Sequence, residues 1–167
     1  MPIIELTTNI NAGIEICFDL SRSIDLHKIS TAHTNETAID GVTTGLIGVN
    51  EFVTWQAKHF GITQKLTVKI TAYNRPFHFR DEQVNGAFKS FSHDHYFEQN
   101  NGQTIMKDVF DFESPYGLPG ILFNKLVLTL YMKKLLAKRN ARAGCLYQTR
   151  HRARGNAPRV YPFSSPM

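Results

Sequence analysis

The chain has 167 residues, of which 42% are hydrophobic and 20% are charged. This composition is typical of a globular domain and excludes a disordered chain, and the length suffices for a core that needs no disulfide or structural metal. The longest apolar stretch, residues 121–132, is too short for a membrane span and contains Asn124 and Lys125. The N-terminus lacks a signal-peptide pattern, and Cys17 and Cys145 are too few for a disulfide framework. We therefore expect a cytoplasmic protein without a transmembrane segment.

Charge is distributed unevenly along the chain. Residues 1–113 contain 9 basic and all 14 acidic residues, whereas residues 114–167 contain 10 basic residues and no acidic one. A nucleic-acid-binding protein usually carries its positive charge on the folded surface, so we expect no specific nucleic-acid partner. Residues 143–167 show no hydrophobic period and are predicted to form a disordered basic tail. The tail fits either a natural extension or a change of reading frame. We expect it to be solvated, and contact with RNA or anionic lipid through its basic and aromatic residues is the alternative.

The first half of the chain is predicted to contain a strand, short helices and a pair of longer strands. Residues 3–8 are expected to form the first strand, and short helices are expected from Ala12 and over residues 21–30. Apolar and polar residues then alternate with a period of two in residues 51–60 and 62–73, which is a strong strand signal.

A two-residue turn at Phe60-Gly61 would set the register of this pair of strands. It places Trp55 opposite Leu66 and Val53 opposite Val68, so that the two apolar faces coincide. The turn and the hydrophobic pattern therefore support the same hairpin.

Further strands are predicted between Pro76 and Phe112. Asn85-Gly86 and Asn101-Gly102 are dipeptides that favour tight hairpins. Together with the preceding pair, these segments predict an antiparallel meander of about five strands.

A long, largely apolar helix is predicted from about Tyr116 or Pro119 to near Arg142. A helix that is apolar over much of its girth is usually covered on more than one side. The order of elements therefore predicts an α+β fold, in which a curved antiparallel sheet wraps around the C-terminal helix and leaves an internal cavity.

Several motifs, taken in order, are similar to those of one superfamily. They are Ile10-Asn11-Ala12, Cys17-Phe18-Asp19-Leu20, Arg75-Pro76, Gly86-Ala87-Phe88, Phe91-x-His93-x-His95-x-Phe97, and Asp108-Val109-Phe110-Asp111-Phe112 before Ser114-Pro115-Tyr116-Gly117. Over residues 2–142 the chain resembles the SRPBCC (START/Bet v 1-like) superfamily, in particular small bacterial ligand-binding members often labelled cell-division or cyclase-like. The resemblance implies a helix-grip domain in residues 1–142 with a deep apolar cavity. The superfamily includes lipid and sterol carriers, ubiquinone-binding proteins, polyketide cyclases and plant allergens, so the fold implies a cavity rather than one reaction.

The turn positions predict polar side chains on the inner face of the sheet. A two-residue turn at Asn101-Gly102 places His95 opposite Asp108 and His93 opposite Phe110.

A similar turn at Asn85-Gly86 would place His78 opposite His93 and Arg80 opposite Phe91. The polar side chains of His78, Arg80, His93, His95 and Asp108 would then form a polar patch in an apolar pocket, which suits a ligand with a polar head. The expected cavity wall consists of Trp55, Leu66, Val68, His78, Arg80, Phe91, His93, His95, Phe97, Met106, Asp108, Phe110, Leu122 and Leu126.

Alternative functions fit these residues. We favour non-catalytic binding of a small hydrophobic or amphipathic molecule, such as a lipid, quinone or polyketide, by a monomer or weak dimer. The alternative is a cyclase or dehydratase that uses His93 or His95 with Asp108 for proton transfer. Alternating histidines on a solvated strand face would be ordinary and without function. A metal site on two histidines and one aspartate is chemically possible. We expect no metal, because such histidine pairs rarely bind one without a third well-placed ligand, and we expect no cofactor.

Overall fold

The structure is a computed structural model that describes residues 3–32, 35–59, 61–113, 130 and 132–134. Its elements in chain order are β1 (Ile3–Ile10), α1 (Ile14–Ser21), α2 (Ile24–Ser30), β2 (Thr37–Gly41), β3 (Phe52–His59), β4 (Ile62–Asn74), β5 (His78–Asn85), β6 (Ser90–Asn100) and β7 (Gln103–Glu113).

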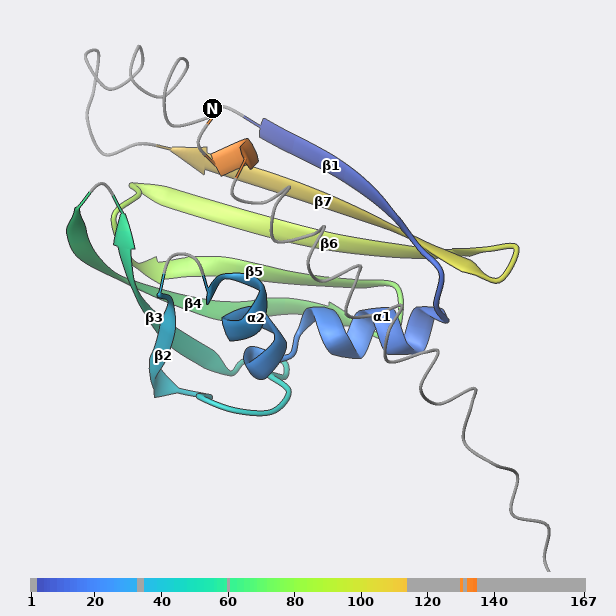
Figure 1. The fold of residues 1–167 in the computed structure, drawn as a ribbon, viewed down its shortest axis with the longest axis horizontal. Helices are drawn as coiled ribbons and strands as arrows, with labels where there is room; N and C mark the ends of the chain where they lie inside the picture. The colour runs from blue at the N-terminus through green and yellow to red at the C-terminus, as the bar shows by residue number, and fades with distance from the viewer. Residues whose placement is uncertain (1–2, 33–34, 60, 114–129, 131, 135–167) are drawn as a thin grey trace, which may run out of the picture.

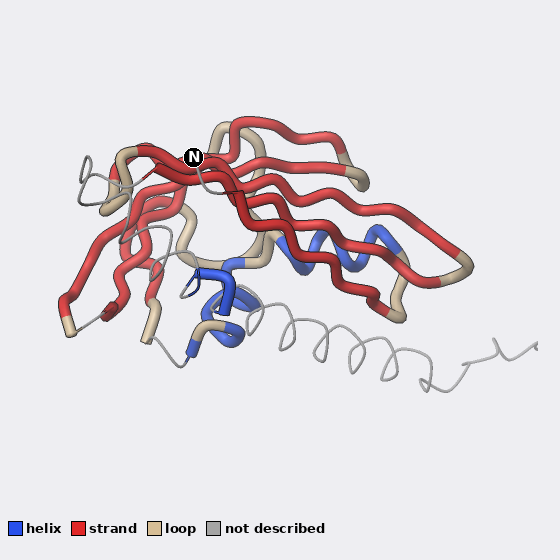
Figure 2. The backbone as a smooth tube through the Cα atoms, turned by 90° about the horizontal axis from the view of Figure 1, so that it is seen from above, coloured by secondary structure: helices blue, strands red, loops and turns tan. Residues whose placement is uncertain are grey.

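The strands form one antiparallel sheet of seven strands in the order β1-β7-β6-β5-β4-β3-β2 (Figure 1). The predicted meander of five strands is confirmed as β3 to β7, because each of these strands pairs with the next along the chain. β1 returns to pair with β7, so the first and last strands lie side by side. The sheet is curved, and α1 and α2 lie on one side of it, which we call the inner face (Figure 2).

The core lies between the inner face and the two helices. Phe18 of α1 has no exposed surface. Its ring meets Tyr73, Phe79 and Phe97 edge-on, with centroids 5.3, 5.5 and 5.5 Å away. A fully buried phenylalanine contributes roughly 1.5–3 kcal/mol through the apolar surface that it removes from water. These contacts hold α1 against strands β4 to β6.

Two of the predicted hairpins are confirmed. Trp55 pairs with Leu66 and Val53 with Val68, as the turn before Ile62 predicts. Asn100 pairs with Gln103 across a turn in which Asn101 and Gly102 both have positive φ, at 47° and 81°. That conformation is the type I′ turn that matches the twist of paired strands.

The predicted hairpin at Asn85-Gly86 is wrong. His78 pairs with Tyr96 rather than His93, and Arg80 pairs with Asp94 rather than Phe91. This shift of three residues turns the expected inner residues of β5 to the outer face, because neighbouring side chains of a strand point to opposite faces.

The physical reason for this register lies in the loop between β5 and β6. Its Phe88 ring packs against Phe91, Phe110 and Phe112, with centroids 5.6–6.2 Å away. The side chain of Gln83 donates a hydrogen bond of 2.8 Å to the Phe88 carbonyl oxygen. Burial of this aromatic ring requires a wider connection than a two-residue turn.

Most of the predicted C-terminal helix lies outside the described residues. Residues 130 and 132–134 are helical, and Met132 packs against the core. Leu122, Leu126 and the predicted tail over residues 143–167 also lie outside the described residues. Within the described part of the chain, no helix is long and apolar enough to cross a membrane.

An ionic cluster ties α1 to the connection between β4 and β5. Asp19 accepts hydrogen bonds of 2.8 Å from Arg22 and 2.9 Å from Arg75. The hydrogen bond from Arg75 is the largest cause that lowers the pKa of Asp19 below its ordinary value of 3.8. The same Arg75 guanidinium lies 2.6 Å from Glu15.

We predict that Asp19→Asn destabilises the protein by about 0.5–1 kcal/mol at pH 7, because it removes a partly exposed ion pair. A carboxylate with a lowered pKa stabilises the folded state above its unfolded pKa, and this contribution is lost as pH falls through the folded pKa. The difference between variant and wild type should therefore shrink below pH 3.8. Urea unfolding at pH 7 and at about pH 3 measures it, with the exposed Glu98→Gln as control. A difference that widens in acid would contradict the assignment.

Gly41 at the end of β2 has φ +72°, and a Cβ at this position would overlap the Phe52 carbonyl oxygen. Gly45 has a similar φ of +76° but open space around it. Alanine at Gly45 should therefore cost about 1–2 kcal/mol, the strain of a left-handed conformation alone. Alanine at Gly41 should cost more, about 2–4 kcal/mol. Urea unfolding measures both variants. Equal unfolding midpoints would contradict this prediction, because they would show that β2 and β3 can move apart at Phe52 without loss of stability.

Candidate functional site

The centre of the inner face carries two histidines and two aspartates, Asp81, His93, His95 and Asp108, which we call the His/Asp ring. β6 supplies both histidines, and their ring centroids lie 4.0 Å apart. Asp108 of β7 pairs with His95, and Asp81 of β5 pairs with His93. One carboxylate therefore flanks the histidines on each side.

Asp108 contacts both imidazoles from the β7 side. Its Oδ1 lies 3.1 Å from His93 Nε2, with hydrogen-bond geometry. The same oxygen lies 2.7 Å from His95 Nδ1, but off the direction of a ring N–H. Asp108 is only 1% exposed, so this carboxylate is held by protein groups rather than by bulk water.

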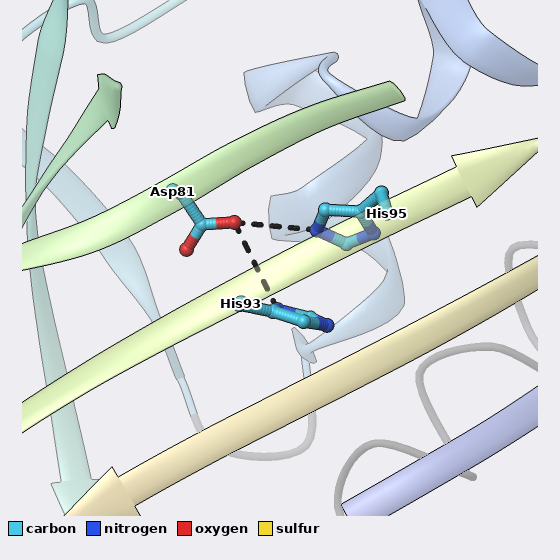
Figure 3. A group of neighbouring side chains, drawn as sticks. All are labelled: Asp81, His93 and His95. Carbon is cyan, nitrogen blue, oxygen red and sulfur yellow. Dashed lines mark hydrogen bonds and ion pairs between the residues drawn. The ribbon is translucent and has the colours of Figure 1, made fainter. Parts of the chain in front are cut away.

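Asp81 contacts the opposite nitrogens of the same two rings. Its Oδ1 lies 3.2 Å from His95 Nε2 and 3.8 Å from His93 Nδ1 (Figure 3). Its side chain is 18% exposed, more than any other member of the ring. Each imidazole therefore has one nitrogen toward Asp108 and the other toward Asp81.

The electrostatics of His95 follow from this arrangement. Burial opposes the charged imidazolium, but the contacts with Asp108 and Asp81 outweigh burial and raise the pKa of His95 above its ordinary value of 6.5. In the absence of another cation, the two carboxylates therefore favour positive charge on His95.

Aromatic side chains flank the His/Asp ring along the sheet. On one side lies the α1-side group, Phe18, Tyr73, Phe79 and Phe97, and the Phe79 ring stacks on His95 with centroids 4.3 Å apart. On the other side lies the loop-side group, Phe88, Phe91, Phe110 and Phe112. Phe110 meets His93 edge-on at 5.4 Å. A buried polar centre thus lies between two apolar areas.

The structure brings together most of the side chains predicted for the cavity wall. Those that lie buried on the inner face are Trp55, Val68, Phe91, His93, His95, Phe97, Met106, Asp108 and Phe110. Leu66 is half-buried and packs against the same core. Trp55 stacks on His27 of α2, with ring centroids 4.2 Å apart.

His78 and Arg80 do not join this group, because the β5 register places them on the outer face. Both contact Asp94, with distances of 2.7 Å from His78 Nε2 and 2.8 Å from Arg80 Nε to its Oδ1. Burial opposes ionisation of Asp94, but these partners outweigh it and lower its pKa below the ordinary value. This outer cluster fastens β5 to β6.

Asp81 is the site residue that sequence reasoning missed. The signal that could have found it is Phe79, a large apolar residue two positions earlier that is 3% exposed. Residues two apart on a strand share a face, so an inward Phe79 brings Asp81 inward as well.

Searches of known proteins found similarity in structure. No family model and no curated protein matches the sequence. Protein TTHA0849 from Thermus thermophilus is similar with a TM-score of 0.68 and 17% identity, over 87% of this chain and 99% of that one. Protein Ms6760 from Mycobacterium smegmatis has a TM-score of 0.65 and 17% identity, over 89% and 92%. Ginseng major latex-like protein 151 from Panax ginseng has a TM-score of 0.64 and 14% identity, over 87% and 97%.

The chain has a Bet v 1-like fold. At these identities the similarity shows the fold alone, and it confirms the Bet v 1-like arrangement of the curved antiparallel sheet. The long C-terminal helix of the expected fold stays a prediction. The resemblance carried by the sequence motifs implies a cavity next to the sheet. Such a cavity would lie on the inner face, which carries the His/Asp ring. The volume of such a cavity, and the contribution of Leu122 and Leu126 to it, stay predictions.

We predict that Asp108→Asn lowers the free energy of unfolding by about 2–4 kcal/mol. The substitution removes a buried charge that contacts two imidazoles, and breaking a buried ionic contact from one side is costly. The control is Glu98→Gln on the neighbouring strand β6, which removes the charge of an exposed carboxylate and should cost less than about 0.5 kcal/mol. Urea unfolding at neutral pH measures both, and equal losses would contradict a special role for the ring.

Proposed function

We propose that the protein binds a small hydrophobic or amphipathic molecule, such as a lipid, quinone or polyketide, on the inner face of the sheet. The observation that supports this most directly is the order of side chains along that face: aromatic group, His/Asp ring, aromatic group. Ligand sites are usually lined by apolar and aromatic side chains, with a few polar groups that fix the orientation of the ligand. The Bet v 1-like fold adds support, since the family resemblance implies a cavity at this place.

The proposed ligand has an apolar body and a neutral polar group. The α1-side and loop-side aromatic groups would contact the body, since aromatic side chains bury large areas and stack on flat molecules. The His/Asp ring offers carboxylate acceptors and imidazole nitrogens. A hydroxyl group of the ligand could therefore donate a hydrogen bond to a carboxylate and accept one from an imidazole N–H. Asp81 is the most exposed member, which makes it the first contact for such a group.

A second candidate is an enzyme of the cyclase or dehydratase type. The contact of 2.7 Å between His95 Nδ1 and Asp108 Oδ1 favours it, because a carboxylate next to an imidazole is a common arrangement for proton transfer. His93 lies beside the same carboxylate. This function would use the same bound molecule as substrate.

The ligand-binding proposal predicts that His95→Phe distinguishes a hydroxylated probe from its deoxy analogue. The substitution keeps a ring but removes its polar atoms. The substitution should weaken the binding of 1-naphthol by about 1–3 kcal/mol, the cost of an unpaired buried polar group. The affinity for naphthalene should stay nearly unchanged. Isothermal titration calorimetry measures both probes. His78→Phe, the same change on the outer face, is the control and should alter neither affinity.

Native mass spectrometry of freshly purified protein would identify the class of natural ligand through co-purifying molecules. A wild-type protein that carries no such molecule and binds neither naphthol nor naphthalene would contradict the proposal. If a co-purifying molecule is converted to product, His95→Phe should lower turnover by about 10²–10⁴-fold with a small change in binding. That result would favour the enzyme over the carrier.

A further inference from the structure

We propose that Asp81, His93 and His95 form a binding site for a divalent first-row transition-metal ion, with Zn²⁺ as the representative ion. This inference does not depend on the organic ligand proposed above, because it concerns the ion alone. The third ligand that the sequence analysis lacked is Asp81, which the observed β5 register brings opposite His93.

The three donor atoms already lie close to metal-ligand spacing. Asp81 Oδ1 is 3.2 Å from His95 Nε2 and 3.8 Å from His93 Nδ1. Each of the three residues offers one ligand atom within 4.8 Å of those of the other two. Ligand atoms around a tetrahedral zinc ion lie about 3.3–3.5 Å apart, as bond lengths of about 2.0–2.2 Å require. Figure 3 shows the carboxylate of β5 facing both imidazoles of β6. Small side-chain rotations would therefore complete the triangle.

Asp108 orients the two imidazoles for this role. It lies against His93 Nε2 and His95 Nδ1, which are the nitrogens that face away from Asp81. If Asp108 accepts the N–H of His93 Nε2, the lone pair that remains on this ring is on Nδ1, the atom nearest Asp81. His95 Nδ1 lies 2.7 Å from Asp108 without hydrogen-bond geometry, and His95 Nε2 is hydrogen-bonded to Asp81. An ion bound by His95 Nε2 and Asp81 would replace that hydrogen bond. A carboxylate that holds the outer nitrogen of a ligating histidine is common in metal sites and fixes both tautomer and ring direction.

Charge balance also favours a cation. Asp81 and Asp108 place two carboxylates in a largely buried region between aromatic groups, and buried charge must be compensated. A divalent ion bound by neutral imidazoles would compensate both carboxylates. Two histidines and one carboxylate form a ligand set used by zinc and non-haem iron, with coordination positions left for water or another molecule.

The test is calorimetric titration of the full-length protein, freed of metal by a chelator, with Zn²⁺. We expect one equivalent to bind to the wild type. Asp81→Asn and His95→Gln should each weaken that binding by at least about 100-fold. The matched control is Glu82→Gln, which removes the neighbouring negative charge on the outer face and should leave Zn²⁺ affinity unchanged.

Asp108 is a positioning residue in this site, and its variant needs a separate readout. Asp108→Asn should lower the affinity for Zn²⁺ by about 10–100-fold, the usual effect of losing a group that holds a ligating histidine. In the metal-free wild type at alkaline pH, imidazole ¹⁵N chemical shifts should show the Nε2–H tautomer for His93, whose Nε2 is hydrogen-bonded to Asp108, and Asp108→Asn should lose this preference. An unchanged His93 tautomer in the variant would show that Asp108 has no positioning role.

Folding is monitored by circular dichroism for each variant, and His95→Gln gives a second test if Asp81→Asn fails to fold. Thermal unfolding of the wild type provides an independent measurement, in which saturating Zn²⁺ should raise the melting temperature. A folded wild type that binds no Zn²⁺ would overturn the proposal and leave the His/Asp ring as a structural ion-pair network. Binding that survives both substitutions would also overturn it, because the ion would then lie elsewhere in the chain.

Discussion

The Asp108 carboxylate lies between strands at the middle of the inner face, and the arrangement around it depends on its two imidazole contacts. A carboxylate with 1% exposure cannot rely on water, so its neighbours must supply hydrogen bonds or positive charge. The register in which His95 pairs with Asp108 brings both histidines of β6 into contact with this carboxylate. Asp81 then approaches from β5 and adds a second charge. The pairing of β5, β6 and β7 is therefore constrained by electrostatics as well as by the burial of apolar side chains.

The aromatic groups make this polar centre more effective than it would be at a surface. In a medium of low dielectric constant, an ionic contact is stronger and an unsatisfied group costs more. Phe79 covers one side of His95, and Phe110 covers one side of His93. These rings restrict the imidazoles to a narrow range of orientations. The same packing that stabilises the sheet therefore also orients the nitrogens for a ligand or an ion.

The sequence predicted those parts of the fold that depend on local rules. Period-two alternation located β3 and β4, and the Asn101-Gly102 turn gave the correct register of β6 and β7, and with it the contact between His95 and Asp108. The β5–β6 register failed because it depends on the ring of Phe88, which packs on residues distant in sequence. A turn dipeptide reports only the local preference of the backbone, whereas the burial of an aromatic ring is a tertiary effect. Because of this error, the sequence predicted His78 and Arg80 on the inner face, where the structure has Asp81.

Trp55 is the only tryptophan in the chain, and its indole lies 5% exposed against the imidazole of His27. That imidazole also contacts Glu36 at 3.2 Å. Imidazole rings quench indole fluorescence on contact, and they do so more strongly when protonated. The tryptophan emission of this protein therefore comes from Trp55 alone, and its intensity reports on the contact between α2 and β3. The fluorescence of Trp55 therefore reports whether α2 packs against the sheet. Circular dichroism of the backbone reports separately on the sheet itself.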